Sequence, residues 1–178
     1  MIAPFSERIS FWDTLLNLAP RDKLYGVLDV DRDILPMFGY KVSEIRQVMS
    51  CVADDIDHTP PSGFSYRAFD VETDAEIVGN VLYNSYLGGV DYELRKSPTI
   101  KAAVDDVIQI SKAYTKSMSQ VVIDEQSGEI IGVVLAGTSE TFTNKMMIEI
   151  GEVGVLPQFR GKGLAKCMIN RVIAQSYD

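Results

Sequence analysis

Histidine is nearly missing from this chain of 178 residues, which holds one histidine, two cysteines and one tryptophan. A lone His58 argues against a histidine-based catalytic triad and against a multi-histidine metal site, so we predict no metal-binding residues. Cys51 and Cys167 lie far apart and form no C-x-x-C pair. We therefore expect two reduced, packed thiols, as is usual inside cells.

Long apolar runs are also missing, since none approaches the ~20 residues that a membrane-spanning helix needs. The N-terminus lacks the basic segment and the unbroken apolar core of a signal peptide. From these absences we expect a cytoplasmic protein with no membrane partner. The formal net charge of -8 argues against broad nucleic-acid binding and mildly favours a cationic substrate.

Acidic residues, common elsewhere, are absent between residues 153 and 177. The same stretch contains the basic residues Arg160, Lys162, Lys166 and Arg171. A basic segment inside an acidic protein suggests a local anionic ligand, although a solvated helix face would have the same composition.

Hydrophobic periodicity divides the chain into residues 1–63, ending in the turn-rich connector 58–63, and residues 64–178. The first region is predicted to contain helices over 6–18 and 42–54 and a strand over 23–30. The second region is predicted to begin with a strand over 64–69, a helix capped by Thr73 and Glu76, and a helix from Pro98. A hairpin of 120–124 and 129–136, a strand over 146–155 and a helix over 161–177 are predicted to follow. This order indicates a mixed α/β fold.

The corner between the last strand and the last helix, 153–165, has features of an anion-binding site. The first turn of a helix has unpaired N–H groups and partial positive charge, and Gly161 and Gly163 let a ligand approach the backbone. A phosphate or pyrophosphate would suit this corner. The pattern of a Walker A loop is absent, and a dinucleotide fingerprint would require a small residue where Lys166 stands.

Residues 158–163, Q-F-R-G-K-G, fit the pattern Q/R-x-x-G-x-G/A. Together with the preceding V-L-P, the following L-A and the order of elements, they resemble the acetyl-CoA signature of the GNAT superfamily of N-acetyltransferases. The resemblance covers about residues 64–178. It implies a mixed, mostly antiparallel sheet flanked by helices, and an acetyl-CoA-binding domain.

The resemblance also implies which residues would hold CoA. Backbone N–H groups of about 159–164 would bind its pyrophosphate, and the strand before the motif would pair with pantetheine through Val153 and Val155. The candidate cofactor-binding residues are therefore Val153, Val155, Gln158, Phe159, Arg160, Gly161, Lys162, Gly163 and Leu164.

In this family an amine attacks the thioester directly, so a base must first remove a proton from the amine. Glu149 and Glu152 on the last strand are the candidate catalytic residues. Strand alternation places them on opposite faces, which a bulge at Gly151 or Gly154 would reverse. Glu149 is favoured and Glu152 comes second, because family members that use a strand glutamate have it where Glu149 stands. By the resemblance Tyr83, Tyr86 and Tyr92 lie in the helix and loop that would border the acceptor site. There they would contact a cationic or aromatic amine or, as we favour, pack in the core and at its rim.

Domains of this family usually continue past the motif helix with further strands, which carry a general acid in many members. Residues 1–63 are interpreted as a remnant of a preceding GNAT unit in a tandem protein, as a segment that completes the sheet, or as an unrelated helical appendage of a truncated chain. The predicted function is acetyl transfer from acetyl-CoA to a small-molecule or peptide amine, by a possible homodimer or tandem protein. The alternatives are a non-catalytic module that binds CoA or a protein, and a nucleotide-binding protein.

Overall fold

The computed structural model describes residues 4–18, 31, 33–41, 57–89, 99–140 and 146–175. The chain divides into two compact units, Met1–Cys51 and Val52–Asp178. Residues 58–63, which the sequence suggests as a connector, group with the second unit. Thr59 and Asp57 contact the last helix there: their carbonyls accept hydrogen bonds from Cys167 Sγ (3.6 Å) and Asn170 Nδ2 (2.8 Å).

The first unit contains the helix α1 (Phe5–Leu18), as predicted, and the 3₁₀ helix η2 (Leu35–Phe38). Trp12 packs with Ile34 and Leu35 in a small buried cluster. An ion pair of 3.0 Å joins Arg8 to Asp31. The strand predicted over 23–30 and the helix predicted over 42–54 lie outside the described residues, so the interpretation of this region stays a prediction.

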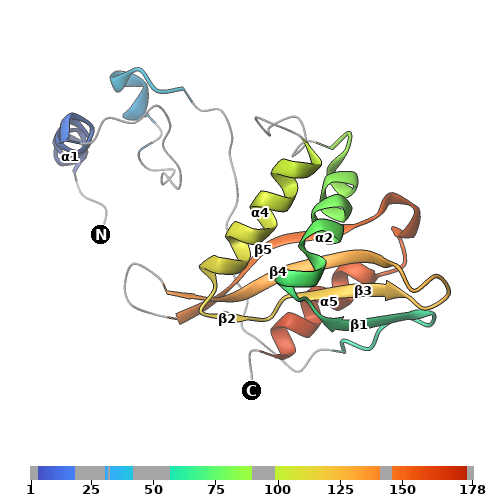
Figure 1. Ribbon diagram of the computed structural model, residues 1–178. Helices are drawn as coiled ribbons and strands as arrows, with labels where there is room; N and C mark the ends of the chain where they lie inside the picture. Colours follow the sequence, from blue (N-terminus) through green and yellow to red (C-terminus); the bar gives the residue numbers. More distant parts are fainter. Residues whose placement is uncertain are drawn as a thin grey trace. The chain divides into compact units, whose positions relative to one another are not determined.

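The second unit is built on a sheet whose paired strands are all antiparallel (Figure 1). Its strands are β1 (Phe64–Ala68), β2 (Lys116–Ser117), β3 (Gln120–Asp124), β4 (Ile130–Glu140) and β5 (Met146–Val155). β1 pairs with β3, and β2 and β3 pair along one side of β4, leaving β5 on its other side. The predicted hairpin and last strand are confirmed, whereas the short β2 was not predicted.

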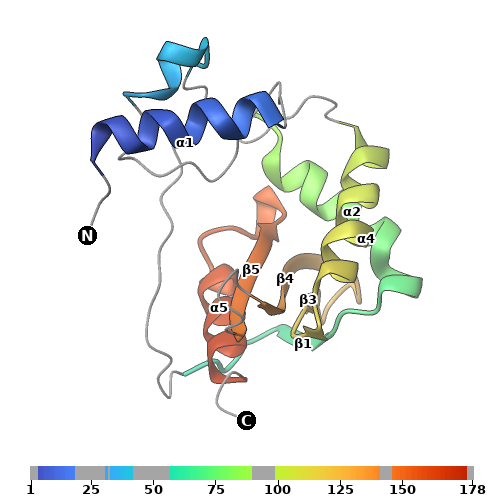
Figure 2. The ribbon, with the colours of Figure 1, turned by 90° about the vertical axis from the view of Figure 1, so that its left-hand side faces the viewer.

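Helices cover both faces of this sheet, as Figure 2 shows. α2 (Val71–Tyr86) and α4 (Ile100–Ala113) lie on one face, and α5 (Leu164–Ala174) lies on the other. Each face has its own core, because side chains of a strand alternate between faces. Val133 and Leu135 of β4 pack toward α2 and α4, whereas Val134 and Ala136 pack toward α5. The predicted mixed α/β fold with a mostly antiparallel sheet flanked by helices is confirmed.

Three helix starts differ from the prediction, each for a local reason. α2 is capped by Asp70, whose Oδ1 accepts the N–H of Glu72 at 2.9 Å, so Thr73 lies inside the first turn. α4 is capped by Thr99, whose Oγ1 accepts the N–H of Ala102 at 3.1 Å. α5 begins at Leu164 instead of Gly161, because Gly161 and Gly163 have left-handed φ values of 78° and 80° that a helix cannot continue.

A buried ion pair fixes the start of α2 against β1. Both oxygens of Asp74 accept from the guanidinium of Arg67, at 2.6 and 2.8 Å, and Oδ2 also accepts the N–H of Asp70 at 3.0 Å. The side chain of Asp74 is 4% exposed, whereas that of Arg67 is 42% exposed. These bonds hold the pKa of Asp74 below its usual value, with Arg67 as the largest cause.

We expect Asp74→Ala to lower the free energy of unfolding of the second unit by about 2–3 kcal/mol at neutral pH, because the Asp70 N–H loses a charged partner. Since the folded carboxyl has the lower pKa, its contribution is full above its unfolded pKa and is lost as the pH falls through the folded value. Urea unfolding should therefore show a smaller gap between variant and wild type at pH 3 than at pH 7. The control is Asp105→Ala, which breaks the exposed pair with Lys101 and should change the stability far less. Equal losses for the two variants would contradict the account.

Candidate functional site

The C-terminal half of β5 has an open backbone edge. Among the described strands β5 pairs only with β4, and the N–H of Leu156 continues that pairing to Ile131 O at 2.9 Å. Because backbone groups alternate in direction along a strand, those of Val153 and Val155 point away from β4. Side chains reach both carbonyls: Tyr86 Oη lies 3.2 Å from Val153 O, and Arg160 Nε lies 3.3 Å from Val155 O.

A row of backbone N–H groups follows this strand. The 3₁₀ helix η3 (Pro157–Phe159) uses the N–H groups of Phe159 and Arg160, which donate to Leu156 O (2.9 Å) and Pro157 O (3.2 Å). The first hydrogen bond of α5 runs from Cys167 N to Gly163 O, at 3.0 Å. Within the described ranges, no backbone carbonyl accepts the N–H groups of residues 161–166.

This row differs from the predicted one, 159–164, at both ends. Phe159 and Arg160 have N–H groups engaged in the turn, whereas Ala165 and Lys166 of the first turn of α5 join the row. Sequence reasoning missed the last two because it began the helix at Gly161. The rule that the first turn leaves its N–H groups unpaired would have identified them from the correct start.

The row borders a shallow hollow that is open to solvent. Its walls are formed by Val155, Phe159, Arg160, Gly161, Gly163, Leu164, Ala165 and Lys166. A Cβ added at Gly161 or Gly163 would meet no atom within 4 Å, so both glycines border open space. Backbone donors, a helix N-terminus and Lys166 together suit an anionic group such as a phosphate.

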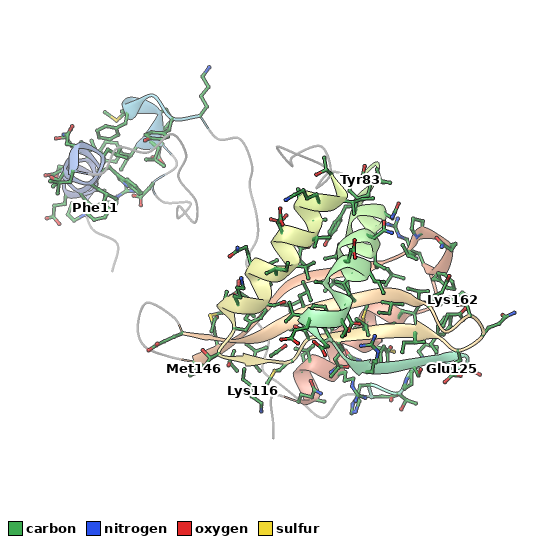
Figure 3. The ribbon with its side chains drawn as sticks, in the orientation of Figure 1. Phe11, Tyr83, Lys116, Glu125, Met146 and Lys162 are labelled. Atoms are coloured by element: carbon green, nitrogen blue, oxygen red, sulfur yellow. The ribbon has the colours of Figure 1, made fainter. Side chains whose placement is uncertain are left out.

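Two basic side chains of the motif have partners inside the protein. The guanidinium of Arg160 donates to Ser85 O near the end of α2 and to Val155 O, so Arg160 joins α2, β5 and the loop. The ammonium of Lys162 lies 5.1 Å from the ring centre of Phe64 and 5.5 Å from that of Phe159, at the end of the sheet opposite Met146 (Figure 3). Arg160 therefore supports the loop, while Lys162 stays at its surface. Gln158, also predicted to contact the cofactor, is exposed on η3.

A bulge in β5 brings the two candidate carboxylates to one face. Leu135 pairs with Glu152 but Ala136 pairs with Ile150, so Gly151 is the extra residue. Glu149 pairs with Gly137, which shares a face with Leu135. Glu149 and Glu152 therefore both lie on the face covered by α2 and α4, and simple alternation is wrong here because of the bulge at Gly151.

Two tyrosines approach these carboxylates. Tyr86 of α2 places its hydroxyl 2.6 Å from Glu152 Oε2. Tyr114, at the end of α4, packs against Gly137 and Gly151. A Cβ added at Gly137 would lie 2.5 Å from the ring of Tyr114, and one added at Gly151 would lie 2.6 Å from its hydroxyl. The pKa of Tyr114 is raised to about 12, mainly by burial and then by the negative charges of Glu149 and Glu152. A hydrogen bond from the backbone of Gly151 lowers it in part.

The sequence analysis named Tyr86 but not Tyr114. The contact of Tyr114 with two glycines on neighbouring strands depends on the register of β4 and β5, which gives no signal in the sequence. Tyr83 lies in the last part of α2 (Figure 3), and Tyr92 lies outside the described residues.

None of the helices in the described part of the chain is both long and apolar enough to cross a membrane. Across those ranges, no group of three or more histidine, cysteine, aspartate or glutamate side chains is arranged to hold a metal ion.

Comparison with solved structures found acetyltransferases. A glucosamine N-acetyltransferase region of a fungal multi-domain enzyme is 21% identical, with 66% of this chain and 12% of that chain covered and a TM-score of 0.48. An N-acetyltransferase from Sphaerobacter thermophilus is 21% identical. The match covers 66% of this chain and 33% of that chain, with a TM-score of 0.48. Glucosamine-6-phosphate N-acetyltransferase from Arabidopsis thaliana is 19% identical. The match covers 64% of this chain and 76% of that chain, with a TM-score of 0.44. This chain thus spans a third or less of the first two.

Comparison with curated proteins found no match. The family model of the acetyltransferase (GNAT) family matches residues 92–177. The matched segment includes β2 to β5, the whole 158–163 motif and α5. Residues 92–177 thus match the GNAT family of acetyltransferases, which confirms the resemblance drawn from the sequence.

Proposed function

We propose that this protein transfers an acetyl group from acetyl-CoA to a primary amine of a small molecule or peptide. One observation carries the proposal: the row of N–H groups from 161 to 166 borders the open edge of β5, inside the segment that the acetyltransferase family matches. A phosphate-containing cofactor with an extended amide arm has the chemistry that such a row and such an edge can bind together.

The residues present fit this cofactor. The N–H groups of 161–166 would hold the pyrophosphate, and both left-handed glycines leave open space where any side chain would intrude. The backbone of Val153 and Val155 would pair with the amide groups of pantetheine. When bound, acetyl-CoA supplies the thioester carbonyl that the amine attacks.

The chain must also take a proton, because an amine is mostly protonated near neutral pH and only its neutral form is a nucleophile. Glu149 and Glu152 are the candidate proton acceptors, on the same face of β5. Their charges, with the net charge of -8, favour an acceptor that arrives as a cation.

Two assays test the function. Calorimetry should show that CoA binds with a dissociation constant in the micromolar range, whereas ATP at the same concentration binds at least about tenfold more weakly. Thiol release from acetyl-CoA should then rise when a panel of diamines, aromatic amines and lysine peptides is added. Binding without turnover would indicate a non-catalytic module, equal binding of ATP would indicate a nucleotide-binding protein, and no binding at millimolar CoA would exclude both CoA functions.

A further inference from the structure

The two carboxylates on β5 have unequal surroundings. Glu149 is exposed, and its Oε2 accepts from Ser139 Oγ at 3.2 Å. Glu152 is half-buried, and its Oε2 lies 2.6 Å from Tyr86 Oη. An O–H···O⁻ bond of 2.5–2.7 Å has the length of a strong, charge-assisted hydrogen bond. Glu152 is thus held more firmly than Glu149, although sequence reasoning favoured Glu149.

The hydroxyl of Tyr86 has a second acceptor, since Val153 O lies 3.2 Å from it. It carries one hydrogen and can donate to the carboxylate or to the carbonyl, and it can accept as well. When Glu152 is ionised, Tyr86 donates to it. When Glu152 is protonated, its O–H can donate to Tyr86, whose hydrogen then turns to Val153 O. Both protonation states of the carboxyl therefore keep a hydrogen bond.

We propose that Glu152 is the residue that takes the proton from the acceptor amine, and that Tyr86 is its positioning residue. The inference rests on the proposed function. In the step, an N–H bond of the ammonium breaks, its electron pair stays on nitrogen, and the proton forms an O–H bond on Glu152. The neutral amine is then ready to attack, and the proton later returns to solvent.

Titratable groups approach Glu152 from several elements. Tyr86 approaches from α2, Tyr114 from the end of α4, and Glu149 from the same strand. Arg160 also lies at this edge of β5, where its Nε donates to Val155 O. With its pKa raised to about 12, Tyr114 stays protonated at neutral pH, so it adds no charge to the site.

A direct test records the carboxyl carbons of glutamate by ¹³C NMR at neutral pH, which requires neither cofactor nor amine. Tyr86→Phe removes only the hydroxyl and should move the carboxyl signal of Glu152, because that carboxylate loses its hydrogen-bond donor. The matched control, Ser139→Ala, removes the hydroxyl beside Glu149 and should leave the signal of Glu152 in place. An unchanged Glu152 signal in Tyr86→Phe would overturn the positioning role.

Kinetics with acetyl-CoA and the best amine of the panel complete the test. Glu152→Gln should lower kcat at least about 100-fold and leave the KM for acetyl-CoA within about threefold, as for loss of a general base. Glu149→Gln should lower kcat less than tenfold. Tyr86→Phe should lower kcat about tenfold and leave the KM for acetyl-CoA nearly unchanged, as expected when a group that positions the base is lost. A larger loss in Glu149→Gln than in Glu152→Gln overturns the assignment, whereas a wild-type protein without turnover overturns the proposed function itself.

Discussion

Replacing Gly163 with aspartate should weaken CoA binding at least about 100-fold, a loss of about 2.7 kcal/mol. Gly163 caps α5 with a φ of 80° in the middle of the donor row. A carboxylate there would lie beside the pyrophosphate, and two like charges a few ångströms apart repel by several kcal/mol at the effective dielectric of a protein surface. Calorimetry with CoA measures the loss.

Two controls separate charge from backbone strain in this experiment. Gly163→Asn has the same shape without the charge, and asparagine tolerates the left-handed region, so it should retain most of the affinity. Gly128→Asp puts an aspartate at a φ of 74° in the turn between β3 and β4, where a Cβ also meets open space, and should leave CoA binding unchanged. If Gly163→Asn binds as weakly as Gly163→Asp, charge at the donor row is not the cause.

Replacing Gly79 with alanine should lower the free energy of unfolding of the second unit by about 2 kcal/mol or more. Gly79 lies where α2 crosses α4, and an added Cβ would lie 2.4 Å from Val104 Cγ2, 2.8 Å from Val104 Cα and 2.9 Å from Val104 N. The helices must separate to make room, because two of these atoms are backbone. Alanine favours a helix by about 1 kcal/mol over glycine, which offsets only part of the cost.

Urea unfolding of Gly79→Ala and of the control Asn80→Ala measures this effect. Asn80 is the next residue of the same helix and is exposed, so its replacement should change stability by under about 0.5 kcal/mol. Equal stability of the two variants would mean that α2 and α4 do not pack at Gly79 as closely as the structure has it.

Regular elements with strong periodicity were predictable from the sequence, and their ends were less so. The hairpin and β5 follow from alternation and turn residues, and the element order follows from the apolar stripes. Helix starts depend on which of several polar residues caps the first turn. Asp70 and Thr73 are both suitable caps, and the additional bond from the Asp70 N–H to Asp74 favours Asp70.

The candidate site was predictable where it is local in sequence. The motif 158–163 identified the loop and the family, because glycines and a helix start lie close together along the chain. The relation of Glu149 to Glu152 was not predictable, since it depends on a bulge that only the register with β4 reveals. The bond between Tyr86 and Glu152 joins residues 66 positions apart, and no local pattern predicts it.

The most direct test of the account is a ¹⁵N amide NMR titration of the protein with CoA. If the donor row holds the pyrophosphate, the amide signals of residues 161–166 should shift most, and those of Val153 and Val155 should shift with them. Amides of the turn at Glu125 and Gly128 should stay unchanged. Absence of shifts at 161–166 with saturating CoA, or shifts confined to another surface, would contradict the account.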